Sequence, residues 1–150
     1  MAALDQQIET DLRTAMKARD TEVVATLRMA LAAIRNARVA AGRQGELTDE
    51  ETVELLTREA KKRSEASEAF ATAGREDAAE KEQRELAILQ RYLPRQLDEE
   101  ELARIVDDAV AATGASSPGD LGKVMSAVMP QVKGRADGKQ VNALVRERLT

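Results

Sequence analysis

The chain has 150 residues, a third of them charged, and a formal net charge of -4. It contains no cysteine and no histidine, which excludes a disulfide framework and a thiolate nucleophile and leaves only carboxylates for a metal site. We therefore expect no metal ion and no cofactor. The sequence starts without a cationic stretch followed by an apolar run, and no window approaches the ~20 apolar residues of a membrane span, so we expect a cytoplasmic protein.

Apolar residues recur at helical spacing along almost the whole chain, without strand-like alternation. The core must consist of Leu, Val, Ile, Met and Ala, because Phe70 and Tyr92 are the only aromatic residues. An Ala-rich, mostly unbranched composition favours helices over strands. The sequence therefore predicts an all-α protein.

Four helices are predicted in the first part of the chain. Their approximate ranges are 4–20, 21–41, 49–73 and 76–92. Glycines within residues 42–45 indicate a loop after the second helix. Thr48 and Glu51 have the spacing of a capping box, which predicts the start of the long, polar third helix.

Pro94 is the strongest break in the sequence, because proline disfavours helix at the preceding residue and donates no backbone hydrogen bond. We therefore predict an N-terminal four-helix domain at 1–94 and a small three-helix bundle at 95–150. The three helices are predicted at about 98–113, 117–133 and 137–149. Asp98, Ser117 and Asp137 are their predicted N-caps, with Glu101 at the capping-box position of the first of these helices and Pro118 at a first helical position. Gly114 is predicted to end the first of them.

The segment Gly134–Lys139 superficially resembles a phosphate-binding loop. Its spacing is one residue short, Gln140 replaces the magnesium-binding Ser or Thr, and no strand precedes it, so we reject a nucleoside-triphosphate site. Two interpretations remain. The free N–H groups of the last helix, with nearby Lys and Arg side chains, could form an anion site. Alternatively, the segment is a turn whose charges face water.

Charge is unevenly distributed along the sequence. Residues 98–120 have a net charge of -6, residues 121–150 of +4 and residues 13–43 of +5. Arg28 and Arg35 lie about 20° apart on a helical wheel, at the border of an apolar stripe. We expect their stems to pack and their head groups to pair with acids of the third or fourth helix. A basic surface is the alternative.

Several blocks of the sequence resemble the GatB/YqeY family in order and spacing, over essentially the whole chain. These blocks are Thr26-Leu27-Arg28-Met29, Gly74-Arg75-Glu76-Asp77, Tyr92-Leu93-Pro94-Arg95-Gln96-Leu97, Leu121-Gly122-Lys123-Val124-Met125 and the run from Val132 to Lys139. Ala78 departs from the pattern, where a bulkier apolar residue is expected. That difference concerns packing alone.

The resemblance implies an N-terminal helical domain followed by a small three-helix domain. It also implies kinship with the tail of the GatB subunit of the glutamyl/aspartyl-tRNA amidotransferase, a tail that looks like a tRNA-contacting appendage. The catalytic cradle of that subunit has no counterpart in this chain. A carbon–nitrogen ligase label with glutamine as amide donor would attach by similarity only.

Three functions follow as hypotheses. The first is a non-catalytic RNA-associated module, for tRNA or another structured RNA, that contacts phosphates through basic residues of the last domain. These residues are Lys123, Lys133, Arg135, Lys139, Arg146 and, as an additional candidate, Arg148. The second is a protein-binding adaptor without nucleic acid. The third is an accessory to a glutamine-dependent tRNA amidotransferase.

Overall fold

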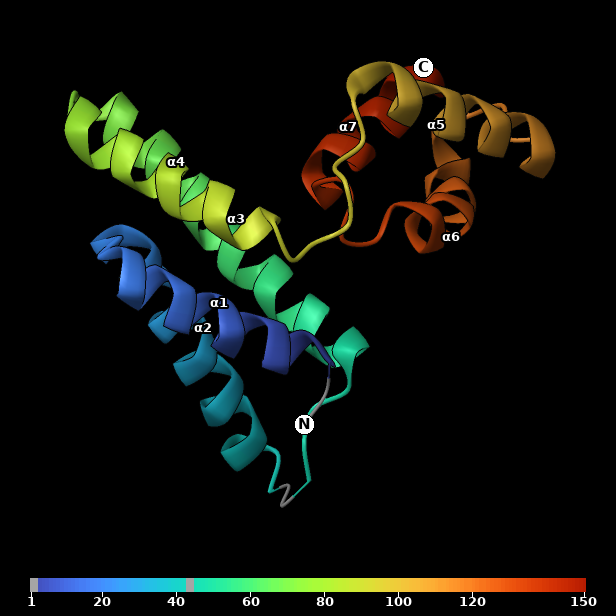
Figure 1. Cartoon of the computed structure of the whole chain (residues 1–150). Coiled ribbons are helices and arrows are strands. Elements are labelled where there is room, and N and C mark those ends of the chain that lie inside the picture. Colours follow the sequence, from blue (N-terminus) through green and yellow to red (C-terminus); the bar gives the residue numbers. More distant parts are fainter. Residues whose placement is uncertain (1–2, 43–44) are drawn as a thin grey trace. The chain divides into compact units, whose positions relative to one another are not determined.

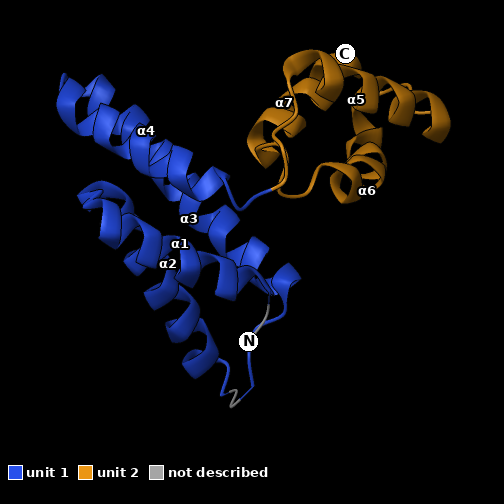
Figure 2. Cartoon of the chain, viewed as in Figure 1, with its two compact units in different colours: residues 1–93 blue, residues 94–150 orange. Residues whose placement is uncertain are grey.

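The computed structural model describes residues 3–42 and 45–150 (Figure 1). That part of the chain contains seven α-helices, one short 3-10 helix and no strand, which confirms the all-α prediction. The α-helices are α1 Ala3–Ala18, α2 Thr21–Ala40, α3 Asp49–Thr72, α4 Glu76–Gln90, α5 Glu99–Thr113, α6 Leu121–Val132 and α7 Gly138–Arg148. Two compact units result, residues 1–93 and residues 94–150, called unit 1 and unit 2 below (Figure 2).

Unit 1 consists of two helical pairs, α1 with α2 and α3 with α4, which share one apolar core. Ile8, Leu27, Leu56 and Leu89 are fully buried in that core, one from each helix. The hydroxyl group of Tyr92 donates to Oδ2 of Asp11 at 2.6 Å, so the residues that follow α4 are fastened to α1. This hydrogen bond links the two ends of unit 1, because Asp11 lies in its first helix and Tyr92 lies two residues before Pro94.

Unit 2 packs α5, α6 and α7 against one another around a valine-rich core. Its fully buried members include Val106 of α5, Val124, Val128 and Val132 of α6, and Val141 and Val145 of α7. Gly114 ends α5 in the left-handed conformation at φ 68°, as predicted from its position after the last apolar residue.

The predicted capping boxes are present. Oγ1 of Thr48 accepts from the Glu51 N–H while Oε1 of Glu51 accepts from the Thr48 N–H. Asp98 and Glu101 form the same reciprocal pair at the start of α5. These bonds use orphan N–H groups of a first helical turn, which explains why the acids are found there.

The structure departs from the sequence interpretation at one helix start. Pro118 opens a 3-10 turn, Pro118–Asp120, and α6 begins only at Leu121. Residues 43–44 of the predicted glycine loop lie outside the described residues. Within the described ranges, every helix is too short or too polar to cross a lipid bilayer.

Candidate nucleic-acid interface

The five basic residues proposed from the sequence lie on one continuous segment of unit 2. Lys123 is exposed in the first turn of α6, and Lys133 follows its last residue. Arg135 is half-buried in the connecting turn, while Lys139 and Arg146 are exposed on α7. We call residues 121–150 the α6–α7 segment. Its net charge of +4 contrasts with -6 for residues 98–120, which include α5.

The turn between α6 and α7 is fastened to the segment that leads into unit 2. The Leu97 N–H donates to the carbonyl oxygen of Arg135 at 2.8 Å, and Nε2 of Gln96 donates to the carbonyl oxygen of Gly134 at 3.0 Å. Nε of Arg135 donates back to the carbonyl oxygen of Arg95 at 3.2 Å. Arg135 therefore holds residues 95–97 against the turn, a role that the sequence did not indicate.

Arg95, whose carbonyl oxygen accepts the hydrogen bond from Arg135, is itself held in place by an ion pair. Arg95 forms a two-pronged ion pair with Glu101, with Nη2 to Oε1 at 2.6 Å and Nη1 to Oε2 at 3.0 Å. These hydrogen bonds, together with the one from the Asp98 N–H, lower the pKa of the Glu101 carboxyl to about 2. The positive charge of Arg135 contributes in the same direction. A negative charge of the protein itself therefore already lies near Arg135.

The start of α7 is less open than the sequence interpretation assumed. Oδ1 of Asp137 accepts from the Lys139 N–H at 3.0 Å, so the cap occupies one of the N–H groups that an anion would use. The left-handed residue of the turn is Gly134, at φ 75°, whereas Gly138 is the first residue of α7. The helix start alone therefore does not form a ready anion site.

Lys139 and Arg146 are a pair of exposed cations on α7. They are seven residues apart on α7, so they project from the same face at about 10 Å spacing along the axis. Nε of Arg146 donates to Oδ1 of Asn142 at 2.7 Å, which orients the guanidinium group without neutralising it. Arg148 differs from Lys139 and Arg146 in that acids partly neutralise its charge. It pairs with Asp107 at 2.7 Å and with Glu147 at 3.7 Å.

The basic residues are spread along the segment and do not surround one point. Lys123 and Lys133 are ten residues apart, or about 15 Å along α6. Lys123 is instead close to Asp120, whose carboxyl pKa is lowered mainly by the N–H groups of Ser116 and Ser117 and in part by the Lys123 charge. Such a distribution suits an extended polyanion better than a single phosphate ion.

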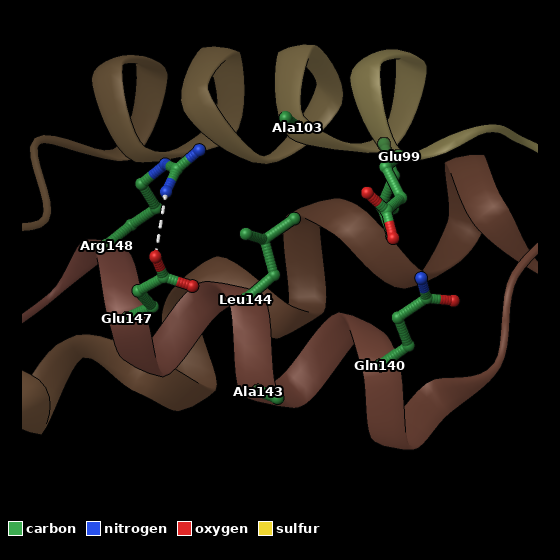
Figure 3. A pocket seen from close by; sticks show the side chains of 8 residues that line it. Glu99, Ala103, Gln140, Ala143, Leu144, Glu147 and Arg148 are labelled. Atoms are coloured by element: carbon green, nitrogen blue, oxygen red, sulfur yellow. Dashed lines mark ion pairs between the residues drawn. The ribbon is translucent and has the colours of Figure 1, made fainter.

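A hollow between α5 and α7 bounds the candidate interface on one side (Figure 3). Its volume is about 410 Å³, and Leu102, Ala103, Ala143 and Leu144 contribute apolar lining. Figure 3 shows Glu99 and Gln140 at one end and the Glu147–Arg148 ion pair at the other. Because carboxylates stand at both ends, this hollow disfavours phosphate. Among the described residues, no cluster of acids has the arrangement of a metal site.

The described residues thus form an all-helical protein of two compact units, with basic residues spread along the α6–α7 segment of the second. Comparison with known families matches residues 5–149 to the family described as Yqey-like protein. The chain belongs to this family, as its sequence blocks predicted.

Two curated relatives connect the chain with named proteins. It is 32% identical over 145 residues to altered inheritance of mitochondria protein 41, mitochondrial, from Pyrenophora tritici-repentis, covering 94% of this chain and 78% of that protein. It is 40% identical over 57 residues to a glutamyl-tRNA(Gln) amidotransferase subunit from Thermococcus gammatolerans, covering 35% of this chain and 9% of that protein. The second match relates part of the chain to a small part of that larger protein.

Proposed function

We propose that this protein is a non-catalytic RNA-associated module that binds tRNA or another structured RNA through the α6–α7 segment. The observation that carries the proposal is the separation of charge within unit 2, where a segment of net charge +4 follows one of -6 in a protein that is acidic overall. A polyanion is attracted to the positively charged residues 121–150 and repelled by the negatively charged residues 98–120. The similarity to an amidotransferase subunit named for tRNA supports an RNA ligand.

The five side chains have different tasks in this proposal. Lys139 and Arg146 contact successive phosphates along α7, and Lys123 and Lys133 extend the contact along α6. Arg135 mainly fastens the turn to residues 95–97, as its hydrogen bond to Arg95 indicates. Phosphate contacts supply affinity and position with little sequence information, so we expect a preference for folded RNA over any particular sequence.

The two compact units correspond, in this proposal, to two domains with a boundary at residues 94–95. Unit 1, with helices α1 to α4, is the scaffold, and unit 2 is the tail-like domain that meets the RNA. The protein would act in the cytoplasm, in a translation context. The catalytic reaction of an amidotransferase is not part of the proposal, because the match to the Thermococcus gammatolerans protein spans 9% of its length.

The test is a comparison of tRNA affinity at one low salt concentration. In the variant Lys139→Gln/Arg146→Gln, two exposed cations are neutralised without touching the core, so binding should weaken about tenfold or more. The control Lys62→Gln/Lys81→Gln changes the net charge equally at exposed positions of unit 1 and should bind as the wild type does. Absence of tRNA binding by the wild type would refute the proposal.

Two alternative functions, a protein-binding adaptor and an accessory to tRNA amidation, can be distinguished from RNA binding by experiment. A protein-binding adaptor is favoured by α2, on which the exposed side chains of Arg28 and Arg35 accompany the exposed apolar side chain of Val39. A stable protein partner that persists after nuclease treatment, together with no tRNA binding, would support the adaptor. An accessory role in tRNA amidation would be supported if amidation of mischarged tRNA by an amidotransferase increased when this protein was added.

A further inference from the structure

An open hollow lies at the turn between α1 and α2 in unit 1, and its lining includes none of the residues proposed to bind RNA. Its volume is about 490 Å³, and its lining is Met16, Arg19, Thr21, Val24, Ala25 and Arg28. Met16 is 48% exposed, which is unusual for a long apolar side chain in this protein. The apolar floor of the hollow consists of Met16, Val24 and Ala25. Arg19 of the turn and Arg28 of α2 line it as well.

The basic residues around this hollow lack acidic partners. The expectation that Arg28 and Arg35 pair with acids of α3 or α4 was wrong, because neither forms an ion pair within residues 3–42 and 45–150. The nearby acids have other partners. Asp20 caps α2 through the Val23 N–H, and Glu22 pairs with Arg84 at 2.7 Å. Arg19, Arg28 and Arg35 are therefore exposed cations without an acidic partner in the described part of the chain.

The same basic and apolar character continues along α2. Arg28, Arg35 and Val39 lie within about 40° of one another on a helical wheel. Val39 is 74% exposed, and with Met16 it makes up the large apolar side chains that are exposed in the described part of the chain. From Thr21 to Val39 this face extends about 27 Å. We call Met16, Val24, Ala25, Arg28, Arg35 and Val39 the α2 face.

The turn between α1 and α2 places a third arginine at the hollow. Arg19 lies in the turn at φ 57°, and it is the residue other than glycine with a positive φ in the described ranges. Glycine or asparagine would adopt this conformation at less cost. This conformation ends α1, because the Asp20 N–H then donates to the carbonyl oxygen of Ala15 at 3.0 Å, and the Arg19 side chain lines the hollow.

We propose that the α2 face is a docking site for an acidic amphipathic helix of a partner protein. Apolar side chains on one side of that helix would fill the hollow beside Met16 and Val24, and flanking carboxylates would pair with Arg19, Arg28 and Arg35. This is the helix-in-groove mode of recognition. RNA fits less well, because its phosphates gain nothing from an apolar floor and the lining of the hollow includes no aromatic side chain to stack on a base. The proposal is independent of RNA binding by unit 2.

The experiment uses the full-length protein with 13C-labelled methionine methyl groups. Two synthetic helical peptides of about 18 residues, the length of the α2 face, share one leucine stripe and carry either Glu or Lys at their polar positions. The Glu peptide should shift the Met16 methyl resonance and leave those of Met125 and Met129 in unit 2 unchanged. The Lys peptide should shift none of them.

Two variants locate the site. Arg28→Glu should weaken binding of the Glu peptide about tenfold or more, and Ala25→Glu should do the same by placing a carboxylate in the hollow. The control Lys81→Glu makes an equal charge change at an exposed position of α4 and should bind normally. Equal binding of both peptides, an unmoved Met16 signal or normal binding by Arg28→Glu would each overturn the proposal. So would displacement of the Glu peptide by tRNA with a shift of Met16, which would make this face a nucleic-acid surface.

Discussion

Leu102→Ala is expected to lower the stability of residues 94–150 and to leave residues 1–93 unaffected. Leu102 is 2% exposed on α5 and belongs to the core of unit 2. Replacing a buried leucine by alanine costs about 2–5 kcal/mol, because the lost side chain leaves a cavity. At about 0.05–0.15 kcal/mol per residue, a unit of about 57 residues has a total stability of roughly 3–9 kcal/mol. The substitution therefore removes a large part of the free energy of unfolding of unit 2.

The assay exploits the position of the two aromatic residues. Phe70 and Tyr92 both belong to unit 1, so tyrosine fluorescence reports on unit 1 while far-ultraviolet circular dichroism reports on both units. A loss of about 2 kcal/mol should lower the unfolding midpoint of unit 2 by about 8 °C or more. The dichroism transition should therefore move to lower temperature or split in two, with the fluorescence transition unchanged.

The matched control is Leu56→Ala, at a fully buried position of α3 in unit 1. This variant should move the fluorescence transition and leave the unit 2 phase of the dichroism signal in place. If both probes shift together in the Leu102→Ala variant, the two units unfold as one. The two-domain interpretation would then be refuted.

Three further predictions concern single contacts. The Glu101 pKa is lowered from 4.5 to about 2, so the Arg95–Glu101 pair stabilises unit 2 above pH 4.5, and this contribution is lost as the pH falls towards 2. Glu101→Gln should flatten the pH dependence of the unit 2 melting temperature in that window; an unchanged profile would contradict the role of the pair. Tyr92→Phe removes the hydrogen bond to Asp11 and should destabilise unit 1 by about 1–2 kcal/mol in urea unfolding, and an unchanged midpoint would show that the bond contributes nothing. Gly114→Ala should cost about 1–2 kcal/mol through its left-handed backbone alone, because no atom lies within 4 Å of the added methyl group; a larger loss would reveal a clash.

The sequence predicted the features that depend on neighbouring residues. The capping boxes of Thr48 and Asp98 and the glycine stop at Gly114 follow from spacings of a few residues, and the structure contains them. The apolar stripes predicted the buried faces for the same reason, since helical periodicity is a local property.

Features that depend on tertiary contacts were not predicted. Gln96 and Gly134 are 38 residues apart, and no local pattern indicates that they share a hydrogen bond. The same limit explains why Arg135 was expected either to bind phosphate or to face water, and not to donate to the carbonyl oxygen of Arg95. It also explains why Arg28 was expected to pair with acids of α3 or α4, although Glu22 in its own helix is the residue that pairs with α4.

The central claim is that the α6–α7 segment binds the phosphates of a structured RNA, and the salt dependence of tRNA binding tests it most directly. With three to five phosphate contacts, a plot of log affinity against log salt concentration should have a slope of roughly -2 to -5. Neutralising Lys139 and Arg146 together should make that slope shallower by about 2. A slope near zero for the wild type, or the same slope in the wild type and Lys139→Gln/Arg146→Gln, would contradict the claim.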